Sequence, residues 1–297
     1  MKRIVECVPN FSEGCRQEVI DRIAQSVGSV EGVTLLDVDP GKDTNRTVVT
    51  FAGEPERVLE AAFQAIKTAS ALIDMRQHRG AHARMGATDV CPFVPVSGMT
   101  MEECVSLAEQ LGERVGRELG IPVYLYAQAA RREDRRRLPD IREGEYEALE
   151  QKLKNPDFEP DFGPSVFNPK AGATAVGARD FLLAYNVNLN TRDVKIASKI
   201  ANRVREKGRM VTDRETGKKS QVPGTCAGVQ GMGWYIPEYE MAQITVNILN
   251  YNETPLWKVF EECERFAAEF GVRVTGSELV GMVPLQALTD VGLHCLQ

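Results

Sequence analysis

The chain has 297 residues, of which 43% are hydrophobic and 26% are charged, and its formal net charge is −6. This composition is typical of a globular protein with one large domain or two smaller ones, and the acidic balance argues against a general nucleic-acid binder. No apolar run approaches the roughly 20 residues of a membrane-spanning helix. The first residues also lack the features of a signal peptide, so we expect no membrane association.

The seven cysteines are scattered through the chain, and no two of them have the Cys-x-x-Cys spacing of a zinc or redox motif. They stand at positions 7, 15, 91, 104, 226, 263 and 295. An odd number of unclustered cysteines favours neither a disulfide framework nor a thiolate metal site. We therefore expect reduced thiols, a cytoplasmic location and no bound metal.

The first part of the chain predicts six elements in the order strand, helix, strand, strand, helix, strand, from runs of β-branched residues and helical apolar spacing. Their ranges are 3–8, 14–28, 33–38, 46–51, 55–73 and 89–96. We expect Ser12 to cap the first helix and Pro55 to open the second. Pro92 and Pro95 favour an edge or bulged position for the last strand over the centre of a sheet.

A helix at about 101–119, a strand at 123–126 and a helical stretch at 143–153 follow. Residues 131–137 (RREDRRR) form either an anion-binding patch or a solvated helix face with both charge signs, which is the more common structure. Four prolines between positions 155 and 172 predict a loop.

The second half repeats the order of the first. Its predicted elements are a strand at 181–189, a helix at 191–207, strands at 229–235 and 241–250, a helix at 255–270 and a strand at 272–275. The repeat predicts an α/β (α+β) protein of two lobes, each a split β-α-β, ferredoxin-like βαββαβ sheet with helices on one face. We expect a ligand to bind in the cleft between the lobes.

Residues 78–89 (HRGAHARMGATD) hold two of the three histidines and show no apolar periodicity. Two glycines and three alanines, Ala81 among them, leave room for a ligand around the inner histidine, His82. A long irregular connection inside a compact domain is more often functional than accidental. This stretch is therefore the main candidate site.

Three interpretations of His78 and His82 are open at this point. Their i, i+4 spacing suits two metal ligands on a helix, but the glycine between them disfavours that helix and no further ligand cluster is near. The two could also be ordinary surface-loop histidines. The third interpretation is acid–base catalysis, because an imidazole titrates near neutrality and can move a proton in both directions. For that role we prefer His82.

Three other stretches have divided interpretations. Asp37 and Asp39 flank a strand end, where they either form a turn, orient a histidine or hold a cationic group. Residues 163–172 combine glycines, an aromatic, an amide and a lysine, which suits either a plain linker or a loop that binds a flat heterocycle carrying an acid. The glycines of residues 228–234 lie in a strand pattern and indicate close backbone approach rather than a phosphate site.

Several long motifs, spread in one order over nearly the whole chain, resemble the glutamate formimidoyltransferase (formiminotransferase domain) family. They are residues 5–14, 45–47, 82–86, 89–93, 160–165, 172–174, 177–179, 233–235, 276–277, 279–281 and 284–285. Such a series is far more specific than any single glycine pattern. Members of this family transfer the formimino group of N-formimidoyl-L-glutamate to N5 of tetrahydrofolate, in histidine breakdown.

The resemblance implies two α/β subdomains, residues 1–178 and 179–297, with tetrahydrofolate as co-substrate, a homodimer, and no nucleic-acid or membrane partner. It implies that His82 is the catalytic acid and base. It also implies a folate-binding loop that consists of Gly163, Pro164, Ser165, Val166, Phe167, Asn168, Pro169, Lys170, Ala171 and Gly172. Vertebrate relatives carry a fused cyclodeaminase domain, so for these 297 residues we expect no deaminase activity.

In the implied reaction, N5 attacks the amidine carbon, and one histidine removes the N5 proton and delivers a proton to the departing glutamate nitrogen. Both substrates carry carboxylates, for which Arg84 and Lys170 are our candidate ligands. Asp39 is our candidate for orienting or charge-stabilising the amidine. Two alternatives stay open: formyl transfer from 5-formyltetrahydrofolate to glutamate, and a folate-binding protein without catalysis.

Overall fold

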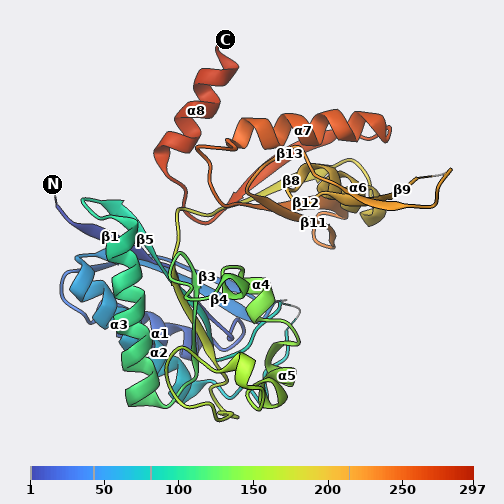
Figure 1. Cartoon of the computed structure of the whole chain (residues 1–297). Helices are drawn as coiled ribbons and strands as arrows, with labels where there is room; N and C mark the ends of the chain where they lie inside the picture. Colours follow the sequence, from blue (N-terminus) through green and yellow to red (C-terminus); the bar gives the residue numbers. More distant parts are fainter. Residues whose placement is uncertain (1, 43, 81, 214) are drawn as a thin grey trace. The chain divides into compact units, whose positions relative to one another are not determined.

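The computed structural model describes residues 2–42, 44–80, 82–213 and 215–297 (Figure 1). The chain forms two compact mixed α/β units, Met1–Arg179 and Asp180–Gln297. Ala81 of the histidine stretch and Asp43 of the preceding turn lie outside the described residues. None of the helices in the described ranges is both long and apolar enough to cross a lipid bilayer.

The N-terminal unit begins with the predicted order of strand, helix, strand, strand, helix, strand. These elements are β1 (Ile4–Cys7) with its continuation β2 (Asn10–Phe11), α1 (Gln17–Gly28), β3 (Val33–Gly41), β4 (Arg46–Gly53), α2 (Pro55–Leu72) and β5 (Thr88–Ser97). Their strands lie side by side in the order β3, β4, β1/β2, β5, and every neighbouring pair is antiparallel. This order is the split β-α-β arrangement that the sequence predicts.

Further elements extend this sheet to seven strands. They are α3 (Met101–Leu119), β6 (Val123–Ala127), a 3-10 turn at Glu133–Arg135, α4 (Leu138–Ile141), α5 (Glu145–Lys152), a 3-10 turn at Pro156–Phe158 and β7 (Thr174–Ala178). The strand β7, which the sequence analysis missed, lies between β5 and β6 and runs parallel to both. Residues 159–173 contain no helix or strand, which agrees with the loop predicted there.

The position of β5 corrects a prediction. This strand is not at an edge, because β1 and β2 pair with one side of it and β7 pairs with the other. A proline lacks only the backbone donor, and the Pro92 carbonyl still accepts a hydrogen bond from Val8 N at 3.2 Å. The irregularities in the β1/β2–β5 pairing fall at Ile4/Val5 and Asn10/Phe11. The edge alternative was wrong because β7 had not been recognised. The bulged alternative is confirmed, because the register passes from Val5–Pro95 to Ile4–Ser97 and leaves Val96 without a partner.

The sheet of the N-terminal unit has a hydrophobic core on each face. Along β6, Val123 and Leu125 belong to the large core beneath α1, α2 and α3, whereas Tyr124 and Tyr126 belong to a smaller core with residues of α4 and α5. Figure 1 shows α3 on one side of these strands and α4 and α5 on the other. The helices therefore cover one face of the βαββαβ part, and the added segment covers the opposite face of its extension.

The start of α1 differs from the prediction. The apolar face predicted for this helix is buried, but the helix begins at Gln17, too far from Ser12 for a capping bond. The Glu13 carboxylate accepts instead from Arg16 N at 2.8 Å and Cys15 N at 3.0 Å. Ser12 Oγ donates to the Gly86 carbonyl oxygen at 2.7 Å. Ser12 therefore joins the first strand to the histidine stretch rather than capping a helix.

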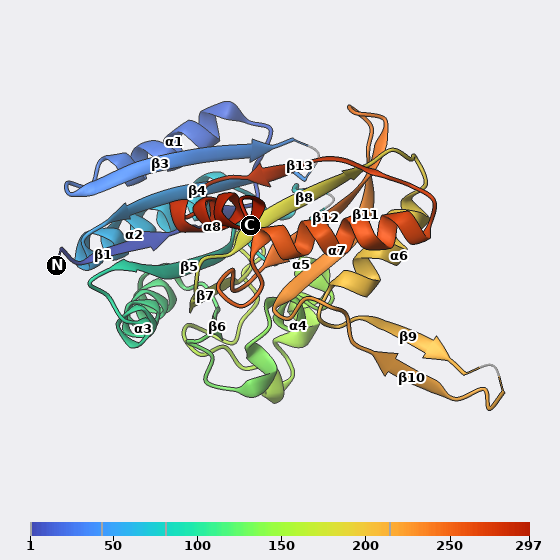
Figure 2. The same ribbon diagram turned by 90° about the horizontal axis from the view of Figure 1, so that it is seen from above.

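The C-terminal unit has the second predicted βαββαβ order. It contains β8 (Leu183–Leu189), α6 (Val194–Val204), a hairpin of β9 (Arg209–Thr212) and β10 (Lys219–Val222), β11 (Val229–Ile236), β12 (Met241–Ile248), α7 (Leu256–Glu269), β13 (Val274–Val280) and α8 (Leu285–Cys295). The strands β11, β12, β8 and β13 form an antiparallel sheet in that order. The hairpin, which projects from this unit in Figure 2, and the helix α8 were not predicted.

The arginine-rich run at residues 131–137 is neither a regular helix face nor an open cationic patch. Four of its five arginines are exposed and pair with nearby carboxylates. Arg135 is buried and pairs with Asp161 at 2.9 Å. The run is a solvated charged surface with one internal ion pair.

Candidate functional site

The loop that connects α2 to β5, residues 73–87, contains no helix or strand in its described residues, as predicted. We call it the histidine loop. Backbone hydrogen bonds join it to the end of the 163–172 loop: Ala87 N donates to Ala171 O at 2.8 Å, and Ala173 N donates to Met85 O at 3.0 Å. A Cβ on Gly86 would lie 2.1 Å from the Ala173 carbonyl oxygen, so only glycine permits this approach. The two stretches that the sequence singled out are therefore neighbours.

His82 is half-buried and both of its ring nitrogens have partners. Nδ1 donates to the Ala83 carbonyl oxygen at 2.6 Å, which places the lone pair of the neutral ring on Nε2. Arg46 Nη1 lies 2.5 Å from Nε2 and donates to it. Burial, together with the positive charges of Arg46 and Arg142, lowers the pKa of His82 to about 4. His82 is thus a neutral base near pH 7.

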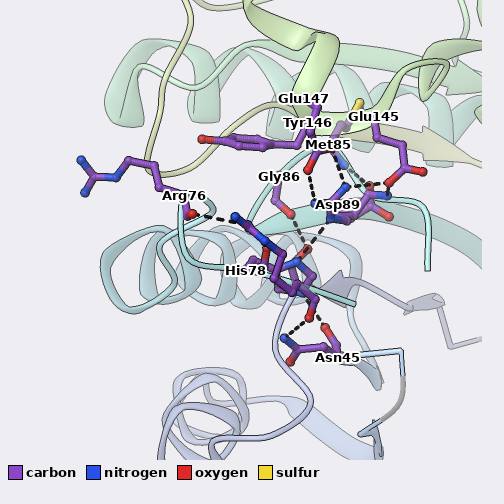
Figure 3. A network of polar contacts seen from close by, with 12 residues as sticks. Asn45, Arg76, His78, Met85, Gly86, Asp89, Glu145, Tyr146 and Glu147 are labelled. Carbon is purple, nitrogen blue, oxygen red and sulfur yellow. Dashed lines mark hydrogen bonds and ion pairs between the residues drawn. The ribbon is translucent and has the colours of Figure 1, made fainter. Parts of the chain in front are cut away.

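His78 is buried and has a different environment. Its Nε2 donates to the Asn45 carbonyl oxygen at 2.8 Å, and its Nδ1 accepts from Arg84 Nε at 3.3 Å. Burial lowers its pKa as well. The side chain of Asn45 bonds Arg79 O and Gly14 N, so this residue joins the histidine loop to the β3–β4 turn (Figure 3). The interpretation of both histidines as surface-loop residues was wrong.

Arg84 lies beneath the site and is only 7% exposed. Its Nη1 donates to Glu145 at 2.6 Å and to Glu147 at 2.8 Å, and its Nη2 donates to Glu147 at 2.5 Å. The hydrogen bonds to Glu147 and Glu145 raise the pKa of Arg84. Binding of a substrate carboxylate by this guanidinium would require one of these pairs to open.

Asp89, at the start of β5, is 1% exposed and pairs with Arg142, which follows α4. Its Oδ1 also accepts from Met85 N at 3.0 Å. The carboxylate therefore holds the end of the histidine loop and neutralises one of the two arginines whose charges act on His82. Figure 3 shows Asp89, Met85 and His78 in one region of polar contacts.

Most of the remaining predicted residues are accessible, but Ala171 and Gly172 are buried. Asp39 lies exposed on β3, and its charge acts on Arg46. In the 163–172 loop, most side chains are exposed, and the Phe167 ring lies 5.4 Å from that of Tyr146. Lys170 Nζ donates to the Ala71 carbonyl oxygen at 2.6 Å. The backbone of this loop is thus anchored while its side chains stay available.

A shallow pocket lies beside His82, and the space of about 170 Å³ within it is continuous with open solvent. Its lining residues all belong to the N-terminal unit and are Ser12, Thr44, Asn45, Arg46, His78, His82, Arg84 and Asp89. Within the described ranges, no group of three His, Cys, Asp or Glu side chains is arranged to hold a metal ion. The pocket offers a neutral imidazole, the buried Arg84 and the half-buried Arg46, a combination suited to proton transfer beside an anionic group.

The contacts of Arg46, Asn45 and Arg142 at this site were not predicted from the sequence. Residues 45–47 (NRT) counted there only as a motif that contributes to the family resemblance. An arginine that approaches a histidine through tertiary packing has no local signature, because the two residues are 36 positions apart. Arg142 lies among many solvated charges, and its pairing with buried Asp89 sets it apart only in the folded chain.

Comparison with known proteins places both units in one family. The model described as "Formiminotransferase domain, N-terminal subdomain" matches residues 4–179, and the model described as "Formiminotransferase domain" matches residues 184–297. The formimidoyltransferase-cyclodeaminase of Rattus norvegicus is 53% identical over 98% of this chain. That alignment covers 52% of the rat protein, so the chain spans about half the length of this relative.

Two shorter relatives are aligned over nearly their whole length. The glutamate formimidoyltransferase of Thermoplasma acidophilum is 46% identical over 99% of this chain and 92% of its own length. That of Streptococcus pyogenes serotype M1 is 43% identical over 100% of this chain and 94% of its own length. With both family models matched across the two units, the chain belongs to the formiminotransferase family.

Proposed function

We propose that this protein is a glutamate formimidoyltransferase, which transfers the formimino group from N-formimidoyl-L-glutamate to N5 of tetrahydrofolate. The products are 5-formimidoyltetrahydrofolate and L-glutamate. Membership of the formiminotransferase family supports the reaction class. The observation that carries the proposal is the neutral imidazole of His82, whose basic Nε2 lies beside the pocket.

The reaction requires a group that first accepts and then donates one proton. N5 attacks the amidine carbon and forms the new N–C bond, and the N5 proton passes to His82 Nε2. The tetrahedral species then breaks the bond between that carbon and the glutamate α-nitrogen. His82 returns the proton to the departing amine, so the enzyme ends the cycle in its starting state. Such acid–base catalysis contributes typically ~10²–10⁴-fold to the rate.

The 163–172 loop is the proposed binding segment for tetrahydrofolate. Its backbone contacts with the histidine loop support this role, because they hold its end close to the proposed base. The pocket has no enclosed space that could hold a water molecule, so it cannot enclose a folate, whereas sites that enclose a drug-sized ligand have roughly 300–1,000 Å³. We infer that it receives the reacting groups, while the rest of the folate extends over the exposed loop. Contact of the folate with the C-terminal unit stays a prediction.

The experiment is an assay of His82→Ala with N-formimidoyl-L-glutamate and tetrahydrofolate. Acidification of the reaction converts the product to the 5,10-methenyl form, whose absorbance reports transfer. We expect turnover to fall at least ~10²-fold, because the proton relay is removed. Tetrahydrofolate affinity should stay within a few-fold. Unchanged turnover would remove His82 from the mechanism.

His294→Ala is the matched control for this experiment, because the third histidine lies on α8 and bonds Glu261 rather than lining the pocket. It should retain full activity. Parallel assays with N-formylglutamate test the formyl-transfer alternative, and folate binding with no transfer by the unmodified protein would favour the non-catalytic one. The homodimer, the cytoplasmic location, the absence of a metal and a place in histidine degradation are further predictions of this proposal.

A further inference from the structure

Arg46, at the start of β4, is a half-buried cation whose Nε is inaccessible to solvent, and it forms no ion pair with any described residue. Its Nε has no hydrogen-bond partner in the described part of the chain, and its Nη1 contacts the uncharged His82 ring. Removing a guanidinium from water without a counter-anion is costly. Burial accordingly lowers the pKa of Arg46 to about 10. A protein retains such an arrangement where the missing anion is supplied by a ligand.

The charged neighbours of Arg46 do not supply this anion. Asp89 on β5 is already paired with Arg142 and bonded to a backbone amide. Asp39 on β3 is exposed and forms no ion pair within the described ranges. The Tyr126 hydroxyl on β6 is neutral near pH 7, because burial raises its pKa to about 12. The guanidinium therefore lines the pocket with unused hydrogen-bonding capacity.

We propose that Arg46 binds the α-carboxylate of N-formimidoyl-L-glutamate and, in doing so, withdraws from His82 and releases Nε2 to act as the base. This inference rests on the proposed function for the identity of the substrate. Before substrate binds, the contact with Arg46 occupies the only basic nitrogen of the His82 ring. The same guanidinium thus couples recognition of the donor to exposure of the catalytic group.

Covalent geometry favours the α-carboxylate over the γ-carboxylate. The α-carboxylate and the reacting nitrogen are attached to one carbon, so the carboxyl carbon and that nitrogen are always about 2.5 Å apart. Arg46 and His82 line the same pocket. A carboxylate on Arg46 therefore holds the departing nitrogen within reach of His82. The flexible γ-carboxylate chain imposes no such distance.

Histidine NMR of the unmodified protein tests the coupling without any turnover. Only three histidines are present, and a His82→Gln variant assigns the resonance. We expect the ring to titrate near pH 4 alone and at least one pH unit higher with saturating N-acetyl-L-glutamate, because a bound carboxylate replaces the cation at Nε2. The analogue 4-acetamidobutyrate lacks the α-carboxylate and should not shift it. Equal titration with and without N-acetyl-L-glutamate would overturn the inference.

Arg46→Gln tests the same contact from the protein side. Loss of the cation should raise the pKa of His82 by at least one unit in the absence of ligand. Arg76→Gln is the matched control, because Arg76 is an exposed arginine of the histidine loop that pairs with Asp74, and it should leave the titration unchanged. An unaltered His82 titration in folded Arg46→Gln would contradict the coupling. If this variant does not fold, the NMR titration of the unmodified protein with N-acetyl-L-glutamate still tests whether Arg46 and His82 are coupled.

Substrate discrimination separates this inference from the proposed function. The unmodified enzyme should favour N-formimidoylglutamate over N-formimidoyl-4-aminobutyrate by at least ~100-fold in kcat/KM, as a charged bidentate contact permits. Arg46→Gln should reduce that ratio to below ~5. An unchanged ratio would place the α-carboxylate elsewhere and defeat the inference. Absence of transfer by the unmodified enzyme would defeat the proposed function, whereas the NMR results would still test the Arg46 contact.

Discussion

The two units share one topology but differ in the loops that it carries. In the N-terminal unit, β3, β4, β1/β2 and β5 lie in the same order as β11, β12, β8 and β13 in the C-terminal unit. In both units, a helix follows the first strand and another precedes the last. The connection from the second helix to the last strand comprises residues 73–87 in the N-terminal unit and residues 270–273 in the C-terminal unit.

The longer connection of the N-terminal unit is the one that carries the candidate catalytic residues. A short connection can only return the chain to the sheet, whereas a long one can bring polar side chains to the strand ends. Two contacts hold the histidine loop and the strand that follows it: the buried Asp89–Arg142 pair and the Gly86 approach to Ala173. In the corresponding connection of the second unit, a Cβ on Gly271 would meet no atom within 4 Å. Variants of these contacts test whether they give the N-terminal unit stability or activity that matched changes in the C-terminal unit do not affect.

The largest effect is expected from Asp89→Asn. This change leaves Arg142 buried without its partner, which typically costs about 3–5 kcal/mol. Both tryptophans, Trp234 and Trp257, lie in the C-terminal unit, so their fluorescence does not report the affected one. We therefore expect faster hydrogen exchange in β5 peptides of the variant.

Glu240→Gln is the control for the Asp89 variant, because Glu240 forms an exposed pair with Arg192 in the C-terminal unit. Exposed pairs contribute about 0–1 kcal/mol, so exchange should change little in either unit. Equal effects of the two variants would mean that the buried pair gives the N-terminal unit no special stability.

A smaller effect is expected from Gly86→Ala. The added Cβ would lie 2.1 Å from the Ala173 carbonyl oxygen, and the resulting backbone shift should cost about 1–3 kcal/mol. It should also reduce transfer activity, because the histidine loop moves away from the 163–172 loop. Gly276→Ala, on β13 of the other unit, adds a Cβ into open space and should leave both stability and activity nearly unchanged. Thermal unfolding and the methenyl assay provide the two measurements.

The smallest effect is expected from Lys170→Ala. The side chain is exposed, so a contact with a folate carboxylate contributes only about 1 kcal/mol, and the Kd for tetrahydrofolate should rise about 3–10-fold. The kcat should change less than twofold. Lys154→Ala, an exposed lysine paired with Glu150, is the control in equilibrium binding. A Kd equal to that of the unmodified protein would remove Lys170 from the folate site.

The regular elements were predictable to the extent that their signals are local. The apolar residues of α1, Val19, Ile20, Ile23 and Val27, recur on one helical face, and all four are buried. The strand β7 was missed because its short run of small residues after a proline-rich loop has no distinctive spacing. That omission also misplaced β5, since the neighbours of a strand depend on which other segments join the sheet.

The candidate site was predictable only in part. Glycines and histidines concentrated in one irregular stretch pointed to residues 78–89. The same composition could not distinguish His78, which is buried against Asn45, from His82, which contacts Arg46. It also suggested Arg84 as a carboxylate ligand, although Glu145 and Glu147 occupy that guanidinium. The environments of these three side chains depend on partners more than 30 positions away in the sequence, so no local pattern could predict them.

By itself, the sequence determined the repeated order of strands and helices, the position of the irregular histidine loop and the resemblance to one family. Each of these depends on patterns among residues that are close together in the sequence. Tertiary structure alone decided that Arg84 and Arg142, near His82, are paired with carboxylates and that Arg46 has no ion pair with a described residue. The charge state of a side chain depends on burial and on the groups that folding brings beside it. The neutral state of His82 and the unpaired charge of Arg46 follow from that packing.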